Sequence, residues 1–276
     1  QNYATNVVAN GYLDIHPIEG FSFRSQLNTH IQNSTVGQYL DGNQSVNLES
    51  TGKKNKADFT KSSSLYLEWN NIVNYKFTML PKEHNLSLTA LTTWSRGQSD
   101  YLSASSVGQT LASNLWWNLG SNDGEDGSLS HSSNYEQYQS FSYAGRVSYD
   151  YKSKYLFTAS LRRDGASRLA EGNKWEWFPS AALAWRITDE AWMTNVKGSW
   201  LDDLKLRATY GVTGNSGIGV YGTKSGITFA NWSFAFQDDA ANRYILGTLD
   251  NNGSGYYVVA NKDTKWEMST TFDFGF

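Results

Sequence analysis

The sequence predicts an all-β protein, an antiparallel sheet that forms part of the wall of a transmembrane β-barrel with long extracellular loops. Apolar and polar residues alternate over segments of about 10 to 16 residues, whereas a soluble strand typically has about five or six. Aromatic residues lie near the ends of these segments, as they do at membrane interfaces. Short and long connections alternate between the segments, as they do in outer-membrane barrels.

The clearest strand is predicted over 65–79. Its odd positions, from Leu65 to Met79, are apolar at seven of eight sites, and its even positions are polar at five of seven. A period of two over this length indicates a strand with two different faces. A weaker strand is expected before His16, and another begins at Phe21 and reaches about residue 28. The same alternation predicts the remaining strands over 86–90, 141–151, 155–162, 181–187, 204–210 and 266–276.

About nine strands result, and their connections are of two kinds. Short turns of about 5, 5, 3 and 16 residues are expected at 16–20, 80–84, 152–154 and 188–203, on the periplasmic side. The intervening loops have about 31, 41, 10 and 49 residues. The longest turn is predicted to hold a short helix whose first turn Thr188 or Asp189 caps.

Composition supports strands and restricts the partners. Gly (24), Trp (11), Tyr (17) and Phe (13) are frequent, and Pro occurs three times. The net charge of -3, without a basic stripe, argues against nucleic acid. Cysteine is absent, which excludes disulfides and thiolate metal sites but leaves the compartment open. No apolar run reaches the length of a transmembrane helix, whereas a barrel strand needs apolar side chains only at alternate positions.

Alternation alone does not separate a soluble β-sandwich from a membrane barrel, because both have one apolar and one polar face. In a barrel the charged face must line a polar interior, since a basic residue facing lipid near the midplane costs about 2 to 4 kcal/mol. Nine strands also leave unpaired edges, so further strands are expected outside this chain. The residues predicted to face the lumen are Glu68, Lys76, Arg146, Asp150, Arg162, Arg186, Lys205 and Arg207.

Four segments in the second half of the chain carry a family resemblance. They read AGRVSYDYKSKYLFTASLRRDGASRL (144–169), WFPSAALAWRITDEAWM (177–193), LDDLKLRATYGVTGN (201–215) and NKDTKWEMSTTFDFGF (261–276). In this order they closely resemble the later barrel region of SusC/RagA-type TonB-linked outer-membrane transporters. The resemblance implies a barrel of roughly 22 strands, a plug gated by TonB and a SusD-like surface lipoprotein as lid.

The resemblance also sets the expected domain content and location. Residues 1–276 are expected to be part of the β-barrel domain, and neither a plug, a TonB box nor a signal peptide is recognised in them. The expected location is the outer membrane of a Gram-negative cell. The implied function is import of oligosaccharides or peptides, with the lipid bilayer, the TonB complex and the lipoprotein as partners; the sequence does not name the solute.

Exposed aromatic residues of the long loops are the candidate contacts with solute or lid. The alternative is that they pack the loops together or belong to the interfacial girdle, which suits Trp175 and Trp177 beside a strand. The full set is Trp116, Trp117, Trp175, Trp177, Trp232, Phe234, Phe236, Tyr256 and Tyr257.

Other motifs lack the context that their chemistry requires. The glycines of GIGVYG (217–222) precede no helix, and the four histidines have no ligand spacing. Asp123, Glu125 and Asp126 could offer oxygens to calcium, but without the spacing of an EF-hand they are interpreted as a solvated turn. No enzymatic activity, cofactor or metal is therefore expected. The alternative functions are a soluble glycan-binding sandwich and a structural or adhesive surface barrel.

Overall fold

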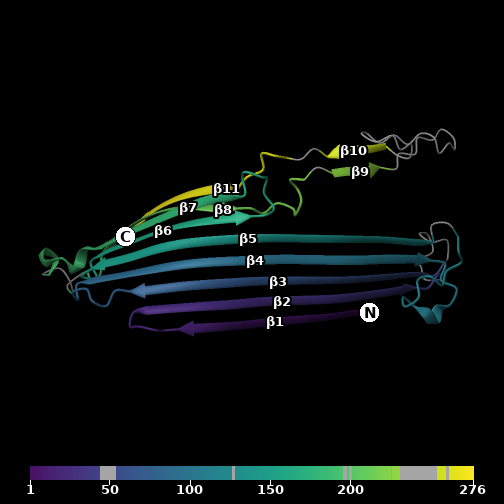
Figure 1. Cartoon of the computed structure of the whole chain (residues 1–276), viewed down its shortest axis with the longest axis horizontal. Helices are drawn as coiled ribbons and strands as arrows, with labels where there is room; N and C mark the ends of the chain where they lie inside the picture. Colours follow the sequence, from purple (N-terminus) through teal and green to yellow (C-terminus); the bar gives the residue numbers. More distant parts are fainter. Residues whose placement is uncertain are drawn as a thin grey trace.

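A single antiparallel sheet of nine strands makes up most of the molecule. The computed structural model describes residues 1–43, 54–125, 128–194, 198, 201–224, 226–230, 254–258 and 261–276. The strand order in the sheet is β1-β2-β3-β4-β5-β6-β7-β8-β11, and β9 and β10 form a separate hairpin. In Figure 1, β1 to β6 lie side by side in this order, and β9 and β10 are set apart from the sheet. The predicted all-β antiparallel class and its nine main strands are confirmed.

Neighbouring strands of the sheet are also neighbours in the sequence, except where β11 follows β8. The strands of the sheet are β1 (Asn2–Ile15), β2 (Phe21–Leu40), β3 (Lys56–Lys76), β4 (His84–Val107), β5 (Leu129–Tyr151), β6 (Tyr155–Ala166), β7 (Trp175–Arg186), β8 (Lys205–Asn215) and β11 (Glu267–Gly275). The hairpin pairs β9 (Gly226–Ala230) with β10 (Ser254–Val258), and it was not predicted.

The connections alternate in length as predicted, but the first two long loops are about half the expected size. They span 41–55 and 108–128, because β2, β3, β4 and β5 have 20, 21, 24 and 23 residues. The added length is rich in Ser, Thr, Asn and Gln, as in 60–64 and 98–106. The apolar alternation that marks a strand from sequence ends before the hydrogen-bonded ladder does.

The turn at 187–204 contains two 3₁₀ turns, η2 (Ile187–Asp189) and η3 (Ala191–Met193), and a third, η1 (Ala112–Asn114), lies in the loop after β4. The predicted capping by Thr188 or Asp189 is wrong, because both residues lie inside η2. The residues that precede η2 and η3 make no side-chain cap hydrogen bond either. Thr188 is instead buried, donating to Asp203 Oδ1 at 3.0 Å and accepting from the backbone N–H of Leu204 at 3.2 Å. Within the described residues, no helix has the length and hydropathy needed to cross a membrane.

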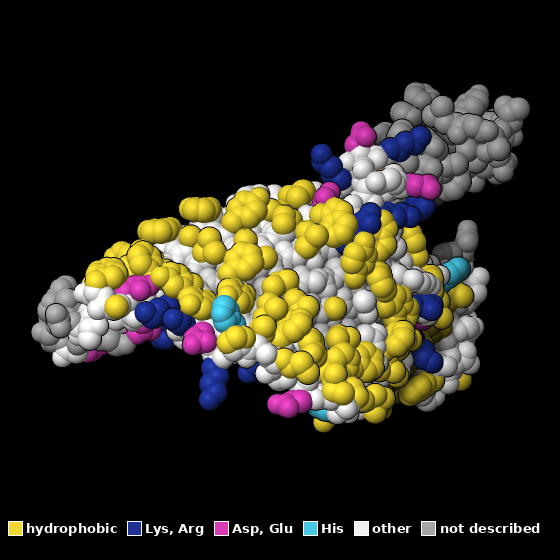
Figure 2. All heavy atoms as spheres, turned by 60° about the vertical axis from the view of Figure 1, so that its left-hand side comes forward, with side chains coloured by type: hydrophobic (Ala, Val, Ile, Leu, Met, Phe, Trp, Pro, Cys, Tyr) yellow, Lys and Arg dark blue, Asp and Glu magenta, His cyan; other side chains and the backbone are white. Residues whose placement is uncertain are grey.

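The sheet is one layer thick. Within the described residues the buried hydrophobic side chains are few, namely Ala57, Ala166, Leu169, Ala170, Phe178 and Val212. Large apolar side chains in mid-strand are uncovered instead: Leu183 is 57% exposed and Phe272 is 72% exposed. Hydrophobic side chains cover much of the face seen in Figure 2, and charged ones lie around its margins. No second layer packs on this sheet in the part of the chain that the structure describes.

Register assigns the side chains to two faces, because directly opposite residues in an antiparallel pair point to the same side. One row across the sheet is apolar, and another row, one residue along each strand, is polar. The apolar row contains Leu86, Tyr149, Phe157, Leu183, Ala208 and Phe274. The polar row contains Lys76, Ser87, Ser148, Thr158, Ala182, Thr209 and Asp273. We call the two sides the apolar face and the polar face.

Candidate functional site

The polar face carries all eight charged residues that were predicted to face the lumen. Pairing places Glu68, Lys76, Arg146, Asp150, Arg162, Arg186, Lys205 and Arg207 on the same side of the sheet as Ser148. Several are ion-paired on that side, with Nε–Oδ1 distances of 2.7 Å for Arg162–Asp164 and 3.8 Å for Arg207–Asp273. The sequence alternation therefore identified a real common surface, although these eight residues are spread over it and do not meet at one point.

A hydrogen-bonded cluster surrounds Glu68 on this face. Its Oε1 accepts from Asn28 Nδ2 at 3.1 Å and from Asn70 Nδ2 at 2.7 Å, and its Oε2 accepts from the Tyr66 hydroxyl at 2.9 Å. The network continues because Thr93 donates to Asn70 Oδ1 at 2.7 Å. The sequence analysis selected Glu68 by its charge but did not select its neutral partners. Asn28 and Asn70 occupy polar positions of the same alternating pattern, which was the available signal.

Aromatic residues join this face midway along β2 to β5. Pairing places His30, Tyr66, Gly97 and Tyr138 in one row, directly beside the row of Glu68. A Cβ on Gly97 would lie 2.3 Å from Tyr138 Cζ, so the ring of Tyr138 lies directly over the glycine. The Arg168 guanidinium stacks 3.8 Å from the centre of that ring. In the sequence, a glycine within a strand can indicate that another group approaches the backbone closely, and Gly97 is such a position.

The loop tryptophans have different surroundings. Trp116 packs on β2, because a Cβ on Gly37 would lie 2.2 Å from its Nε1, whereas Trp117 is 65% exposed. Trp175 and Trp177 lie in strand β7 on the apolar face, not in a loop. Trp232, Phe234 and Phe236 lie outside the described residues. Tyr256 and Tyr257 lie in β10, opposite Thr228 and Ile227.

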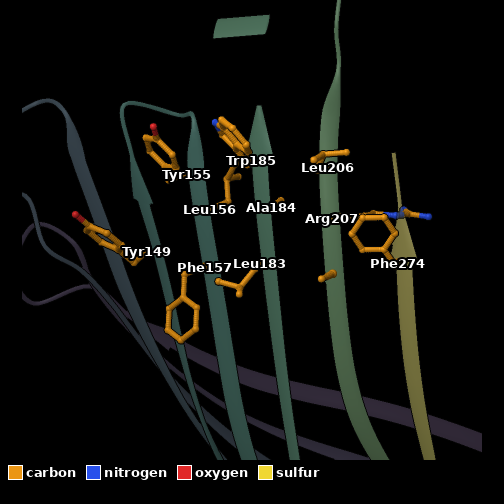
Figure 3. A pocket seen from close by; sticks show the side chains of 11 residues that line it. Tyr149, Tyr155, Leu156, Phe157, Leu183, Ala184, Trp185, Leu206, Arg207 and Phe274 are labelled. Carbon is orange, nitrogen blue, oxygen red and sulfur yellow. The ribbon is translucent and has the colours of Figure 1, made fainter. Parts of the chain in front are cut away.

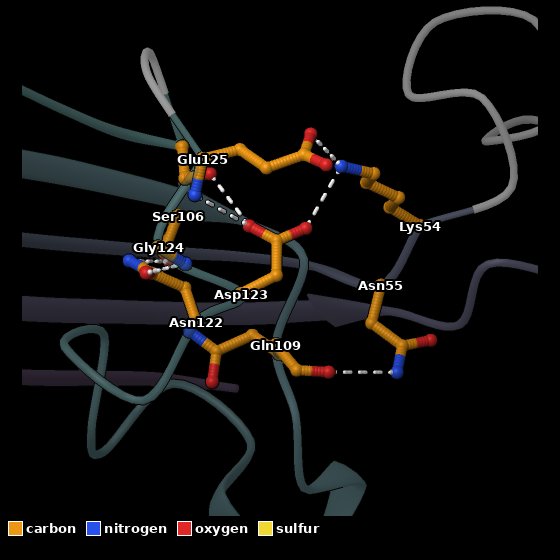
Figure 4. Close-up of polar contacts among 9 residues, drawn as sticks. Lys54, Asn55, Ser106, Gln109, Asn122, Asp123, Gly124 and Glu125 are labelled. Carbon is orange, nitrogen blue, oxygen red and sulfur yellow. Dashed lines mark hydrogen bonds and ion pairs between the residues drawn. The ribbon is translucent and has the colours of Figure 1, made fainter.

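Two long loops are joined by Lys54, Asp123 and Glu125 (Figure 4). Lys54 Nζ lies 2.8 Å from Asp123 Oδ2 and also pairs with Glu125, and Asn55 donates to the Gln109 carbonyl oxygen at 3.2 Å. The Lys54 ammonium, together with hydrogen bonds from Ser128 and the Glu125 backbone, lowers the pKa of Asp123 to about 2. This clamp connects 41–55 with 108–128. Asp126 lies outside the described residues.

The short-turn end carries an aromatic rim on the apolar face. Tyr151 and Tyr155 stack with ring centres 6.3 Å apart, and Tyr155 and Trp185 with centres 6.4 Å apart. The Tyr155 hydroxyl and Trp185 Nε1 both donate to Glu190 Oε1, at 2.6 and 3.0 Å. These hydrogen bonds, from Tyr155 first, hold the pKa of Glu190 below its ordinary value. Glu190 therefore anchors the turn at 187–204 beneath the ends of the strands.

A shallow hollow of about 340 Å³ lies above this rim, between β5 and β11. Figure 3 shows Tyr149, Phe157, Leu183 and Phe274 projecting from neighbouring strands around it. The small side chain of Ala208, in the same row, leaves space between Leu183 and Phe274. The lining is mostly apolar, which fits a hydrocarbon chain and not a polar solute. Within the described residues, no group of three or more His, Cys, Asp or Glu is placed to hold a metal ion.

Comparison with known proteins gives consistent matches. A family model described as "TonB dependent receptor-like, beta-barrel" matches residues 2–276. "TonB-dependent receptor P26" of Formosa agariphila is 27% identical over 273 residues, covering 99% of this chain and 26% of that protein. "TonB-dependent receptor SusC" of Bacteroides thetaiotaomicron is 36% identical over 144 residues, covering 49% of this chain and 13% of that protein.

Solved structures give the same fold. The structure described as the RagAB peptide transporter matches with a TM-score of 0.82 at 22% identity, covering 99% of this chain and 28% of that chain. A RagAB peptide importer in an "open-open" state matches with a TM-score of 0.81 at 23% identity. The chain spans about a quarter of the length of the first curated relatives that it matches.

Proposed function

Since the chain belongs to the TonB-dependent receptor-like β-barrel family, we propose that it forms part of the wall of an outer-membrane transporter that imports oligosaccharides or peptides. On this proposal residues 1–276 belong wholly to the barrel domain of a Gram-negative outer-membrane protein. The plug and the contacts with the TonB complex then lie in parts of the protein outside this chain. The solute passes without chemical change, so no enzymatic step or cofactor is assigned.

The observation that carries this proposal is the height of the uncovered apolar face. On β5, Phe141 and Tyr151 lie on that face ten residues apart, with Tyr143, Val147 and Tyr149 between them. At about 3.3 Å per residue this is about 33 Å along the strand, or about 25 Å for a strand tilted by about 40°. A transmembrane barrel has an outward apolar band of about 25 Å with aromatic residues at both borders.

Lipid contact explains why these side chains need no second layer. Burying a side chain of this size against protein gives about 1.5 to 3 kcal/mol, and acyl chains supply an equally apolar environment. A soluble sandwich would instead require a second sheet on the apolar face, and none packs there within the described residues. The outer edges of β1 and β11 need backbone partners in lipid, which we assign to other strands of the full barrel.

The polar face is assigned to the aqueous interior, where it would meet the solute. The Glu68 cluster offers hydrogen-bonding groups, and the ring of Tyr66 lies beside it. Sugars and peptide backbones both bind to such mixed surfaces. A structure described as a peptide transporter is among the matches, and the family resemblance of the sequence implies oligosaccharides or peptides, so the proposal keeps both solute classes. A SusD-like lipoprotein is the proposed lid, and the exposed Trp117 is a candidate contact for it or for the solute.

Uptake by cells tests the proposal. Cells that carry the intact protein are given fluorescent oligosaccharides and fluorescent oligopeptides, with and without a functional TonB. We expect uptake of one solute class that is lost when TonB is absent. Uptake that does not depend on TonB would contradict energised import, and no uptake of either class would favour a structural or adhesive barrel. A purified protein that stays monodisperse without detergent would contradict the membrane assignment.

A further inference from the structure

The apolar face carries one cation within its membrane-height band. By register, that band runs from the row of Tyr151 to the row of Phe141, and within the described residues its only charged side chain is Arg163. Arg163 lies opposite Tyr143 and Trp177, one row inside the border that Phe141 and Trp175 form at the loop end. In the proposed orientation, this border is the interface with the outer leaflet.

Aromatic side chains hold the Arg163 guanidinium in place. Its Cζ lies 5.3 Å from the ring centre of Trp175 and 5.1 Å from that of Trp177. Its Nη1 donates to the Tyr143 hydroxyl at 3.0 Å. Tyr143 and Trp177 are themselves perpendicular, with ring centres 6.0 Å apart. These contacts fix the plane of the guanidinium at the rim and shield its stem from lipid.

The guanidinium keeps unused hydrogen-bond donors. The bond from Nη1 to Tyr143 is its only hydrogen bond to a described residue, so its Nη2 has no described partner. Its Nε also has no partner but is buried, so it is not counted among the donors open to a ligand. No carboxylate of the described residues pairs with it. The neighbouring Arg162 differs, because it points to the polar face and its Nε donates to both oxygens of Asp164 at 2.7 and 2.9 Å. On the polar face Arg24, Arg186 and Arg207 also pair with carboxylates, whereas Arg146 pairs with no carboxylate of the described residues.

A second arginine lies nearby on the same side of the sheet. Arg96 is opposite Gln139, one row beyond Trp94 and Phe141, and its Nη2 donates to Gln98 and Gln137 at 3.2 Å. Its Nε is also buried without a partner, and no described carboxylate pairs with it. A small hollow near both arginines is lined by Trp94, Phe141, Gly165, Trp175 and Lys174, and neither arginine is part of its lining. This rim therefore combines positive charge with aromatic walls.

We propose that this rim binds the phosphate of an outer-leaflet lipid headgroup, with Arg163 as the principal ligand. The proposal rests on the proposed function, because it requires the apolar face to meet the membrane. A planar guanidinium with free donors is suited to a phosphate, which accepts two parallel N–H bonds. The same pairing removes the cost of leaving a cation at the border of the hydrocarbon.

Lipid binding to the purified intact protein tests this proposal. Native mass spectrometry is used to titrate monophosphoryl lipid A, and the same glycolipid without its phosphate, onto detergent-solubilised protein. We expect the phosphorylated lipid to bind about tenfold more tightly, because charge-assisted hydrogen bonds to the phosphate are lost in the other lipid. Arg163→Gln should abolish that difference, and Arg163→Lys should retain part of it, since it keeps the charge without the fork.

Arg162→Gln is the matched control, because it removes a guanidinium one residue away on the opposite face. It should keep the full preference for the phosphorylated lipid. The proposal is overturned if Arg163→Gln binds both lipids as the wild type does, if Arg162→Gln loses as much, or if a soluble sugar phosphate binds as tightly as the lipid. Wild-type uptake and detergent dependence test the transporter assignment separately, so a failure of the lipid site alone is distinguishable.

Discussion

At the scale of single residues, the polar face and the loop clamp are each organised by a carboxylate that accepts hydrogen bonds from several donors. Glu68 accepts from Asn28, Asn70 and Tyr66, and Asp123 accepts from Lys54 and Ser128. Side chains arranged in this way are held in one orientation without a protein core around them. The consequence is that removing one carboxylate charge frees several donors at once.

Glu68→Gln is expected to destabilise the intact barrel by about 1 to 2 kcal/mol, because the amide replaces an acceptor oxygen with a donor that faces other donors. The measurement is the temperature at which the folded, heat-modifiable band is lost on electrophoresis. Glu83→Gln is the control, since Glu83 is exposed in the turn before β4. Equal effects of the two substitutions would contradict a special role for the Glu68 cluster.

The loop clamp is expected to open in acid. Because the folded-state pKa of Asp123 is lowered to about 2, its contribution is complete above the unfolded-state value of about 4. It is lost as the pH falls from about 4 through about 2. Hydrogen exchange of 108–125, corrected for its intrinsic pH dependence, should rise in this interval in the wild type. Asp123→Asn should exchange faster already at neutral pH, and a wild-type profile without an acid transition would count against the clamp.

At the scale of elements, the hairpin between β5 and β6 shows how the chain turns at the membrane border. Lys152 and Ser153 have φ values of 52° and 53°, the two consecutive left-handed residues of a type I′ turn. The Ser153 N–H donates to Asp150 Oδ1 at 3.1 Å, which favours this conformation. The turn matches the twist of the strands, so three residues suffice to connect them.

Opposite substitutions at Ser153 test this turn. Ser153→Gly should stabilise the protein by about 0.5 to 1 kcal/mol, since glycine adopts positive φ without steric cost. Ser153→Val should destabilise it by about 1 to 2 kcal/mol, because a β-branched residue is disfavoured there. Urea unfolding midpoints in detergent provide the comparison. If both variants shifted the midpoint in the same direction, the left-handed turn would be wrong.

Strand identity was predictable from the sequence, whereas strand length was not. Alternation located 65–79 because apolar side chains occupy every second site, but it did not extend that strand back to Lys56. Residues 60–64 are polar on both faces, which suits strands that stand above a membrane in water. The common polar surface of the charged residues was predictable for the same reason. The stacking of Arg168 on Tyr138 was not, because it depends on a packed connection after β6.

At the scale of the whole molecule, one sheet separates two environments without a protein core. The apolar face is about 25 Å high between its aromatic borders, and the strands β2 to β5 continue beyond it. A structure of this kind is stable only where one side is in hydrocarbon and both sheet edges are paired.

Arginine substitutions on adjacent residues should therefore have unequal effects. Leu161 lies near mid-height on the apolar face, and Ser160 lies beside it on the polar face. Leu161→Arg should cost about 2 to 4 kcal/mol and reduce the amount of folded protein in the membrane. Ser160→Arg should have a much smaller effect, because the new charge stays in water. The measurement is the folded fraction on heat-modifiable electrophoresis, and equal losses would argue against a lipid-facing side.

The most direct test of the central claim is a spin-label scan along β5 from 143 to 151 in the intact protein. This chain has no cysteine, so single cysteines can be introduced here once any others in the protein are removed. Labels at odd positions such as Val147 and Tyr149 should collide with oxygen dissolved in lipid, and labels at Arg146 and Ser148 with a water-soluble nickel chelate. The account would be contradicted if the accessibility of the labels to the two reagents did not alternate from residue to residue. It would also be contradicted if the odd positions were accessible to the nickel chelate and the even positions to oxygen.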